Sequence, residues 1–458
     1  MGSERTRAAE LAQVVADALG GPLPVRLRAW DGSEAGAPAG QNTPVVVLRR
    51  RRALRHLLWH PGELGLARAY VLGDLDVEGD LAAGLALVRA AVRHQPRPAP
   101  TPARRRAARS LRTALPLALR SGALGPPPRR PATEARLRGR MHTRRRDRAA
   151  IAHHYDLSND FYTLLLDSRL TYSCAYWSDD PGQDLEGAQL AKLDLVCRKL
   201  GLRPGARLLD IGCGWGALTL HAAEAHGARV VGLTLSAEQQ RLVEKRAKER
   251  GLEDRVDVRL QHVVDLADDP TVENVDAIAS LEMGEHVGGD PEYREFARLL
   301  HDSVRPGGRV LVQQMSRADV APSGGAFIES YIAPDMHMRP LDRTLALLAG
   351  SGLEVRDVHA LREHYPRTVA AWSATLEDRW DDARSPWSVR KRRGSGGSTW
   401  PAARSPSPRT GWALTSCSWS ARTPTGAAGC RTPAATGAER SSAGSGPAAS
   451  TVRAILTP

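Results

Sequence analysis

Ala206-Arg-Leu-Leu-Asp-Ile-Gly-Cys-Gly-Trp-Gly-Ala217 is the stretch that decides the fold. An apolar run that follows Pro204 and Gly205 and ends in glycines is typical of a buried parallel strand. Residues 217–225 continue the chain with good helix formers. A strand, a glycine turn and a helix together predict an open α/β crevice in which backbone N–H groups face a ligand.

The spacing of the glycines separates classes of ligand. Dinucleotide-binding turns favour G-x-G-x-x-G, whereas residues 210–216 follow D-x-G-x-G-x-G. This pattern resembles the first motif of class I S-adenosylmethionine methyltransferases. The next predicted strand, residues 228–234, ends in Thr234 where an acidic residue would usually hold the ribose. Later strand patterns alternate with helical ones and predict a Rossmann-like α/β fold with a mostly parallel, doubly wound sheet.

Composition divides the chain into four parts. Residues 1–95 mix helical and short strand patterns and predict a small α+β domain, and residues 150–383 carry the methyltransferase pattern. Residues 96–149 are rich in Pro, Ala and Arg and predict a basic linker. A helix at 107–120 in this linker would suit an anionic membrane surface or a solvated spacer equally well. Residues 384–458 predict a disordered, low-complexity tail.

The net charge of +13 is a poor guide to partners because it is unevenly distributed. From Arg384 onward the chain has eleven Lys/Arg and one acidic residue, which leaves +3 for the remainder. A nucleic-acid methyltransferase should carry a target-base motif such as N/D-P-P-Y after its fourth strand, where this chain reads Ser280-Leu-Glu-Met-Gly-Glu285. We therefore expect no nucleic-acid partner.

The cellular location follows from what the sequence lacks. No run approaches the roughly 18 apolar residues of a spanning helix, and the N-terminus has no signal-peptide pattern. The five cysteines show neither metal-ligand spacing nor a disulfide framework. We expect a cytoplasmic protein without a metal.

Several motifs in order resemble those of cyclopropane-fatty-acyl-phospholipid synthases, and the resemblance runs from about residue 20 to 383. The motifs are Ala152-His-His-Tyr-Asp-Leu-Ser-Asn-Asp-Phe-Tyr162, Tyr172-Ser-Cys-Ala-Tyr-Trp177, Gly232-Leu-Thr-Leu-Ser236, Glu282-Met-Gly-Glu-His-Val-Gly288 and Tyr331-Ile-Ala-Pro334. Residues 26–36 resemble the actinobacterial branch, and the N-terminal domain resembles the family's small lipid-associated domain.

The resemblance implies methyl transfer from S-adenosylmethionine to the cis double bond of a phospholipid acyl chain at an anionic membrane surface. Attack by the alkene leaves a carbocation, and loss of a proton from the new methyl group closes the cyclopropane ring. The family uses a bound bicarbonate ion as the base. The resemblance therefore implies a protein that is peripheral at the inner membrane face. It leaves the oligomeric state open, with a homodimer as one option.

Site residues follow from the motif positions. The resemblance implies that Cys174, Glu285 and Tyr365 hold the bicarbonate, with Gln313 where some members have histidine. For the cofactor it implies Tyr172, Ser173, Asp210, Gly212, Gly214, Gly216, Thr234, Leu235 and Gln239. Aromatic rings at Tyr155, Tyr162, Tyr176, Trp177 and Phe327 are candidates to stabilise the cation.

The tail departs from the family, whose members continue with a helical, acidic and apolar ending. That ending, written in GC-rich codons and read one base later, gives a sequence close to Gly394-Ser-Gly-Gly-Ser-Thr-Trp-Pro-Ala-Ala-Arg-Ser405. We interpret the tail as the product of a reading-frame shift between about Ala383 and Pro386. Translation of the neighbouring frame of the DNA tests this hypothesis, because it should restore the family ending.

Two alternative functions remain open. The same cation can undergo a hydride shift before it loses a proton, which gives a 10-methylene branch that a reductase partner would convert to a methyl branch. Residues 26–36 and Gln313 favour this product. A truncated chain could instead be an inactive remnant that binds cofactor or lipid without turnover.

Overall fold

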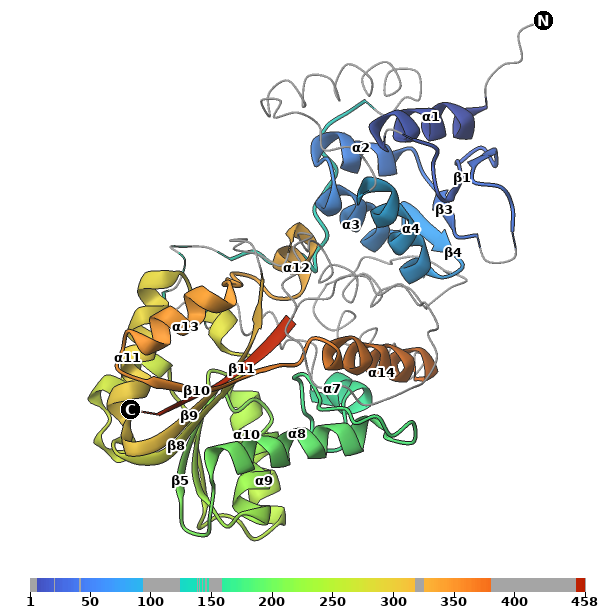
Figure 1. Cartoon of the computed structure of the whole chain (residues 1–458). Coiled ribbons are helices and arrows are strands. Elements are labelled where there is room, and N and C mark those ends of the chain that lie inside the picture. The colour runs from blue at the N-terminus through green and yellow to red at the C-terminus, as the bar shows by residue number, and fades with distance from the viewer. Residues whose placement is uncertain are drawn as a thin grey trace, which may run out of the picture. The chain divides into compact units, whose positions relative to one another are not determined.

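The computed structural model describes residues 6–19, 21–40, 43–93, 124–137, 139, 141, 143–144, 146–147, 159–317 and 325–379, and the backbone of 450–457. The chain divides into two compact units (Figure 1). Among the described residues, unit 1 comprises those up to Ala135 together with Gly325–Tyr331, and unit 2 comprises the rest. No described helix is long and apolar enough to cross a membrane.

Unit 2 contains the predicted α/β sheet, with strand order β10-β11-β9-β8-β5-β6-β7. The glycine motif follows β5 (Arg207–Ile211), which pairs in parallel with β6 (Arg229–Thr234) and β8 (Val275–Leu281). β7 (Val256–Leu260) and β9 (Val304–Ser316) extend the parallel part on either side. This arrangement confirms the doubly wound, Rossmann-like sheet.

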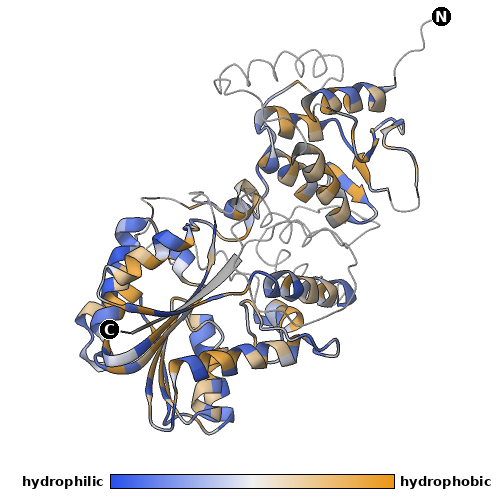
Figure 2. Cartoon of the chain, viewed as in Figure 1, coloured by the Kyte–Doolittle hydropathy of each residue, from blue (hydrophilic) through white to orange (hydrophobic). Residues whose placement is uncertain are grey.

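Helices cover both faces of this sheet (Figure 1). One core layer packs α8 (Leu185–Leu200), α9 (Ala217–Ala225) and α10 (Ala237–Glu249) against the strands. The other packs α11 (Asp290–Ser303) and α13 (Leu341–Ala349). The central strands are largely hydrophobic, whereas the covering helices carry hydrophobic and hydrophilic residues (Figure 2). Because β5, β6, β7, β8 and β9 run parallel, their carboxyl ends lie at one edge of the sheet, where the crevice forms.

The low-complexity tail contains one described strand that the sequence patterns did not predict. Ser450–Thr457 form β11, which pairs antiparallel with β9 on one side and with β10 (Glu354–Ala360) on the other. Residues 452–456 read Val-Arg-Ala-Ile-Leu, a mainly apolar run that suits a central strand. The proposed frame-shift region and the rest of the tail lie outside the described residues.

Unit 1 is the predicted small α+β domain. Its sheet has the order β2-β1-β3-β4, built from β1 (Arg26–Arg28), β2 (Glu34–Gly36), β3 (Val45–Leu48) and β4 (Leu75–Glu78). The helices are α1 (Arg7–Leu19), α2 (Arg52–Trp59), α3 (Glu63–Val71), α4 (Leu81–Arg93) and α12 (Ala326–Tyr331).

The boundary of unit 1 differs from the composition boundary at residue 95. Residues 124–135 belong to unit 1, where Arg68 donates two hydrogen bonds to Glu134. α12 comes from far along the chain, so the Tyr331-Ile-Ala-Pro334 motif is divided between the two units. The predicted helix at 107–120 lies outside the described residues.

Candidate active site

The glycine motif forms the predicted turn between β5 and α9. Gly212, Gly214 and Gly216 have φ of 78°, 55° and 79°, a region that favours glycine. A Cβ on Gly212 would lie 3.0 Å from Met283 Cγ, whereas one on Gly214 would meet nothing within 4 Å. A Cβ on Gly216 would lie 2.6 Å from Val243, so this glycine permits close packing of α9 on α10.

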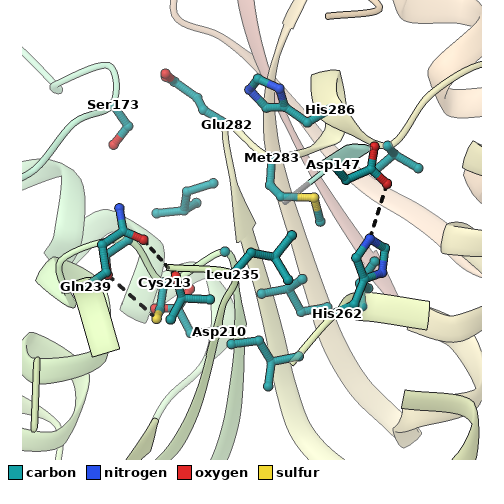
Figure 3. Close-up of a pocket in the computed structure, with 18 of the residues that line it drawn as sticks. Asp147, Ser173, Asp210, Cys213, Leu235, Gln239, His262, Glu282, Met283 and His286 are labelled. Atoms are coloured by element: carbon teal, nitrogen blue, oxygen red, sulfur yellow. Dashed lines mark hydrogen bonds and ion pairs between the residues drawn. The ribbon is translucent and has the colours of Figure 1, made fainter. Parts of the chain in front are cut away.

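A cavity of about 340 Å³ opens at this turn (Figure 3). Of the residues predicted to bind the cofactor, those that line it are Tyr172, Ser173, Asp210, Gly212, Gly214, Thr234, Leu235 and Gln239. Gly216 is not among the lining residues. Much of the remaining wall is apolar and comes from several elements: Leu170, Ile211, Leu218, Leu233, Val263, Val264, Leu281, Met283, Val287, Phe296 and Leu299.

Asp210 lies at the end of β5 on the cavity wall. Burial raises the pKa of its carboxyl group to about 6, while the hydroxyl of Thr219, which donates at 2.7 Å, and the charge of Lys192 oppose the shift. Lys192 is itself buried and donates to Ser173 Oγ at 2.8 Å. Lys192 was not predicted from the sequence, because a lysine within a helix normally reads as a solvated residue.

Gln239 presents a hydrogen-bond donor to the cavity. Thr234 Oγ1 donates to Gln239 Oε1 at 2.7 Å, which fixes the orientation of the amide. The Nε2 atom is buried and has no hydrogen-bond partner among the described residues. A buried donor without a partner is costly, so this amide fits a ligand that offers an acceptor, such as a ribose hydroxyl.

Residues 144, 146 and 147, from the end of the predicted linker, contact loops around the cavity. Asp147 lines the cavity and lies 3.4 Å from His262 Nε2, and the two face each other in Figure 3. Arg144 pairs with Asp265 at 2.7 Å. Arg146 donates two hydrogen bonds to Asp335, another lining residue. These contacts place Arg144, Arg146 and Asp147, from the predicted linker at residues 96–149, beside the cavity.

The residues predicted to hold bicarbonate converge on Glu282, which the motif positions did not single out. Glu282 Oε1 accepts hydrogen bonds from the backbone N–H of Cys174 at 2.8 Å and from Gln313 Nε2 at 2.9 Å. Glu282 also lines the cavity, directly after β8, with a φ of 53° that is rare for a residue with a side chain. The sequence could have indicated Glu282 as a site residue, because it is the first residue of the Glu282–Gly288 motif.

Glu285 lies one turn beyond Glu282 and is fully buried. Its Oε1 accepts from the backbone N–H of Met315 at 2.6 Å, and its Oε2 has no hydrogen-bond partner among the described residues. Burial raises the pKa of this carboxyl group to about 8, and the neighbouring charge of Glu282 adds to the shift. Glu285 therefore holds its proton at neutral pH.

Tyr365, on α14 (His364–Asp378), completes the set. Burial raises the pKa of its phenol well above the usual value, and the negative charge of Glu282 acts in the same direction. The fold thus brings the four predicted residues to one place, around a fifth. None of Cys174, Glu285, Gln313 and Tyr365 lines the cavity itself, whereas Glu282 does.

Aromatic side chains gather beside this set. The ring of Tyr172 lies 5.3 Å from those of Tyr162 and Trp372, and Tyr162 lies 4.4 Å from Trp215. Of the predicted rings, only Tyr162 joins this cluster among the described residues. Tyr176 stacks on His364, Trp177 carries Arg367 over its face, and Phe327 belongs to unit 1. Tyr155 lies outside the described residues.

Comparison with known proteins gives consistent matches. Residues 142–392 match the family model described as mycolic acid cyclopropane synthetase. A probable fatty acid methyltransferase of Pseudomonas putida is 35% identical over 361 residues, 78% of this chain and 82% of that protein. Tuberculostearic acid methyltransferase UfaA1 of Mycobacterium tuberculosis is 32% identical over 372 residues, 78% of this chain and 79% of that protein.

A solved structure agrees with these matches. The crystal structure of mycolic acid cyclopropane synthase CmaA1 complexed with SAH and CTAB has a TM-score of 0.52 and 27% sequence identity. The match covers 68% of this chain and 98% of that one.

Proposed function

We propose, from the premise that the chain belongs to the mycolic acid cyclopropane synthetase family, that it converts the cis double bond of an unsaturated phospholipid acyl chain to a cyclopropane. Family membership makes the chain an S-adenosylmethionine-dependent methyltransferase that modifies lipid acyl chains. The observation that carries the finer proposal is the position of Glu282, which joins the cofactor cavity to the buried Cys174, Glu285 and Gln313.

The residues of the cavity fit S-adenosylmethionine. Gly214 leaves open space beside the turn, and the amide of Gln239 offers the ribose a donor that has no partner among the described residues. Ser173, held by Lys192, and Asp210 supply polar groups at the same wall. When bound, the cofactor supplies an electrophilic methyl group on a sulfonium centre.

The apolar wall suits the other reactant. An alkene is a weak nucleophile, so the site must align it with the methyl group and exclude water. The lining by Leu281, Met283, Phe296 and Leu299 provides such a surface. The rings of Tyr172 and Trp215, both lining residues, can stabilise a positive charge on the acyl chain through their faces.

The residues present do not fit the bicarbonate that the resemblance implies. An anion at this position would need the N–H of Cys174 and the amide of Gln313 as donors. Both donate to the Glu282 carboxyl group instead. A second anion beside Glu282 would also meet like-charge repulsion. The carboxyl group of Glu282 thus takes the hydrogen bonds that bicarbonate would need.

The branched product remains the second candidate. The relative named tuberculostearic acid methyltransferase covers most of this chain, and that name favours methyl branching. The two products share the cation and differ in whether a hydride shift precedes proton loss. A reductase partner would be required only for the branched product.

Phospholipid of an anionic membrane is the proposed substrate surface, which would make the protein peripheral at the cytoplasmic face. Unit 1 exposes apolar side chains, Leu66, Val71 and Leu87, that support contact with lipid. A homodimer is compatible with the proposal and is not required by it.

Lipid analysis tests the function. The full chain is expressed in cells fed oleate and methyl-deuterated methionine, and phospholipid acyl chains are analysed by mass spectrometry. We expect an acyl chain heavier by one CH₂ group that retains two deuterium atoms. Ozonolysis separates the products, because an exocyclic methylene gives a ketone and a cyclopropane survives. Cofactor binding by the purified chain without any labelled lipid would favour the inactive remnant.

A further inference from the structure

We propose that Glu282 is a catalytic residue that accepts the proton released on ring closure, in the role that bicarbonate has in the family. The inference rests on the proposed function and concerns how this chain completes the reaction. It begins from geometry: the carboxyl group stands at the cavity wall and makes the hydrogen bonds that a small anion would make.

The hydrogen bonds hold Glu282 in one orientation. Cys174 and Gln313 lie on separate elements, and both side chains are fully buried. Both residues donate to the same oxygen, Oε1, which fixes the carboxyl plane from two directions. The amide of Gln313 is neutral. It therefore lowers the proton affinity of the carboxylate less than a charged histidine at this position would.

The neighbouring Glu285 has a different role from Glu282. Two carboxyl groups so close together cannot both be ionised at low cost, and Glu285 is the one that retains its proton at neutral pH. Its hydrogen bond from Met315 anchors it away from the cavity that Glu282 lines. Glu285 thus acts as a positioning residue, whereas Glu282 faces the reactants.

The step balances without an added reactant. The π electrons of the alkene form the new C–C bond to the methyl carbon, and the S–C bond breaks with its electrons left on sulfur. The adjacent carbon carries the positive charge. Glu282 then takes a proton from the new methyl group, and the electrons of that C–H bond close the ring. The carboxyl proton returns to solvent when the product leaves.

Removal of the carboxyl group should convert the site into a bicarbonate site. Glu282→Ala leaves the N–H of Cys174 and the amide of Gln313 facing a space of carboxylate size. We expect activity to fall about 10²–10⁴-fold, the usual contribution of a general base, and to recover when formate or bicarbonate is added. The wild-type chain should be insensitive to bicarbonate in CO₂-depleted buffer. Glu282→Asp should retain more activity than Glu282→Gln.

A binding measurement keeps the test independent of turnover. Carbon-13 NMR of labelled bicarbonate should show line broadening with Glu282→Ala and none with the wild-type chain, in the presence of S-adenosylhomocysteine. Bicarbonate binding or bicarbonate-dependent activity of the wild-type chain would overturn the inference. Absence of a labelled lipid from cells that express the wild-type chain would instead count against the proposed function.

A separate cluster carries a second inference: the structure assigns a transition-metal site to the junction of α8 and α9. The Cys197 sulfur and ring nitrogens of His221 and His226 lie within 4.8 Å of one another. Asp194, one turn before Cys197, brings a carboxylate oxygen to 2.8 Å from His221 Nε2 and 3.8 Å from His226 Nε2. Cys, His and carboxylate are the ligands that Zn²⁺ prefers.

The environment points to an ion more than to simple packing. His226 Nε2 is buried without a hydrogen-bond partner among the described residues, although it faces the cluster. Donor atoms around a tetrahedral zinc stand about 3.3–3.8 Å apart, so small side-chain shifts would complete the shell. The Asp194 side chain is 37% exposed, so the cluster lies near the surface. Spacing along the chain could not indicate this site, because its ligands come from two helices.

Cobalt provides the probe for this site. The full chain, stripped of metal, is titrated with Co²⁺, and tetrahedral thiolate ligation should give a near-ultraviolet charge-transfer band and strong visible bands at one equivalent. Cys197→Ser should abolish the charge-transfer band, and His226→Gln should weaken binding about tenfold or more. His301→Gln, which changes an exposed histidine beside Asp302, is the matched control. Bands that are absent from the wild type, or unaffected by Cys197→Ser, would refute the assignment.

Discussion

Arg146 donates two hydrogen bonds to Asp335, at 2.6 and 2.9 Å, although the residues are 189 positions apart in the sequence. The pair holds Arg146, and with it the neighbouring Asp147, beside the cavity wall. We predict that Arg146→Ala weakens S-adenosylmethionine binding about 5–20-fold, since a bidentate charged pair is worth about 1.5–3 kcal/mol and part of it would be lost to solvent. Calorimetric titration measures the change. Arg241→Ala, which breaks an exposed pair with Glu238, should leave affinity unchanged.

Gln239 should contribute to cofactor binding through its buried amide. Gln239→Leu keeps the volume and removes the donor, so we expect cofactor affinity to fall about 10–100-fold. The matched control is Gln240→Leu, at the next position of α10, where the amide donates to the backbone oxygen of Val258 instead. Equal losses from the two variants would show that Gln239 acts through the helix and not through the ligand.

Stability should depend on pH through Glu285. The pKa of its carboxyl group is about 8 in the folded chain, against 4.5 for a glutamate in water, so between these values the folded chain binds more protons than the unfolded chain. Its contribution to stability is therefore full below the lower value and is lost as pH rises toward the higher one. Glu285→Gln removes this dependence.

The measurement is thermal unfolding of both chains between pH 5.5 and 8.5. We expect the stability of Glu285→Gln relative to wild type to rise by up to about 1.4 kcal/mol per pH unit. Glu253→Gln, at an exposed position, should show no such trend. A constant difference between wild type and Glu285→Gln across this range would contradict the assignment of a proton to Glu285.

Unit 1 should depend on the buried pair of Arg68 and Glu134, which are 3% and 7% exposed. Arg68→Met leaves the carboxylate buried and unpaired, and we predict a loss of about 3–5 kcal/mol. The double variant Arg68→Met/Glu134→Leu should recover most of it, because two apolar side chains pack without a charge. Arg28→Met breaks more exposed pairs with Glu34 and Glu78 and should cost about 1 kcal/mol or less.

The parts of the fold that depend on local chemistry could be predicted from the sequence. The backbone at Gly212 and Gly214 has a positive φ, which favours glycine. Strands that alternate with helices along the chain favour a parallel sheet. The four residues predicted to hold bicarbonate were identified by motif position, and their convergence depends on long-range packing of α14 against residues near Cys174. Glu282 was missed because the motif directed attention to Glu285. The difference between the two lies in burial and hydrogen bonding, which spacing does not reveal.

Other features were beyond reach of local patterns. Composition predicted a basic linker at residues 96–149, and three side chains near its end, those of Arg144, Arg146 and Asp147, have partners far away in the sequence. Glu134 belongs to unit 1 through its hydrogen bonds from Arg68. The two residues are far apart in the sequence, so no local pattern predicts this contact or the boundary of unit 1. Composition did not predict β11, because a single apolar run of a few residues within a low-complexity tail is weak evidence for a strand.

The position of β11 has a consequence for how the protein is made. β9 and β10 are not neighbours in the sheet, and residues 450–457 are the piece that joins them. This piece leaves the ribosome after every other strand that the structure describes. Until then, β9 and β10 each present an unpaired edge, which is the surface that seeds association with other chains. The nascent protein therefore passes through a stage at which the edges of β9 and β10 are open to pairing with other chains.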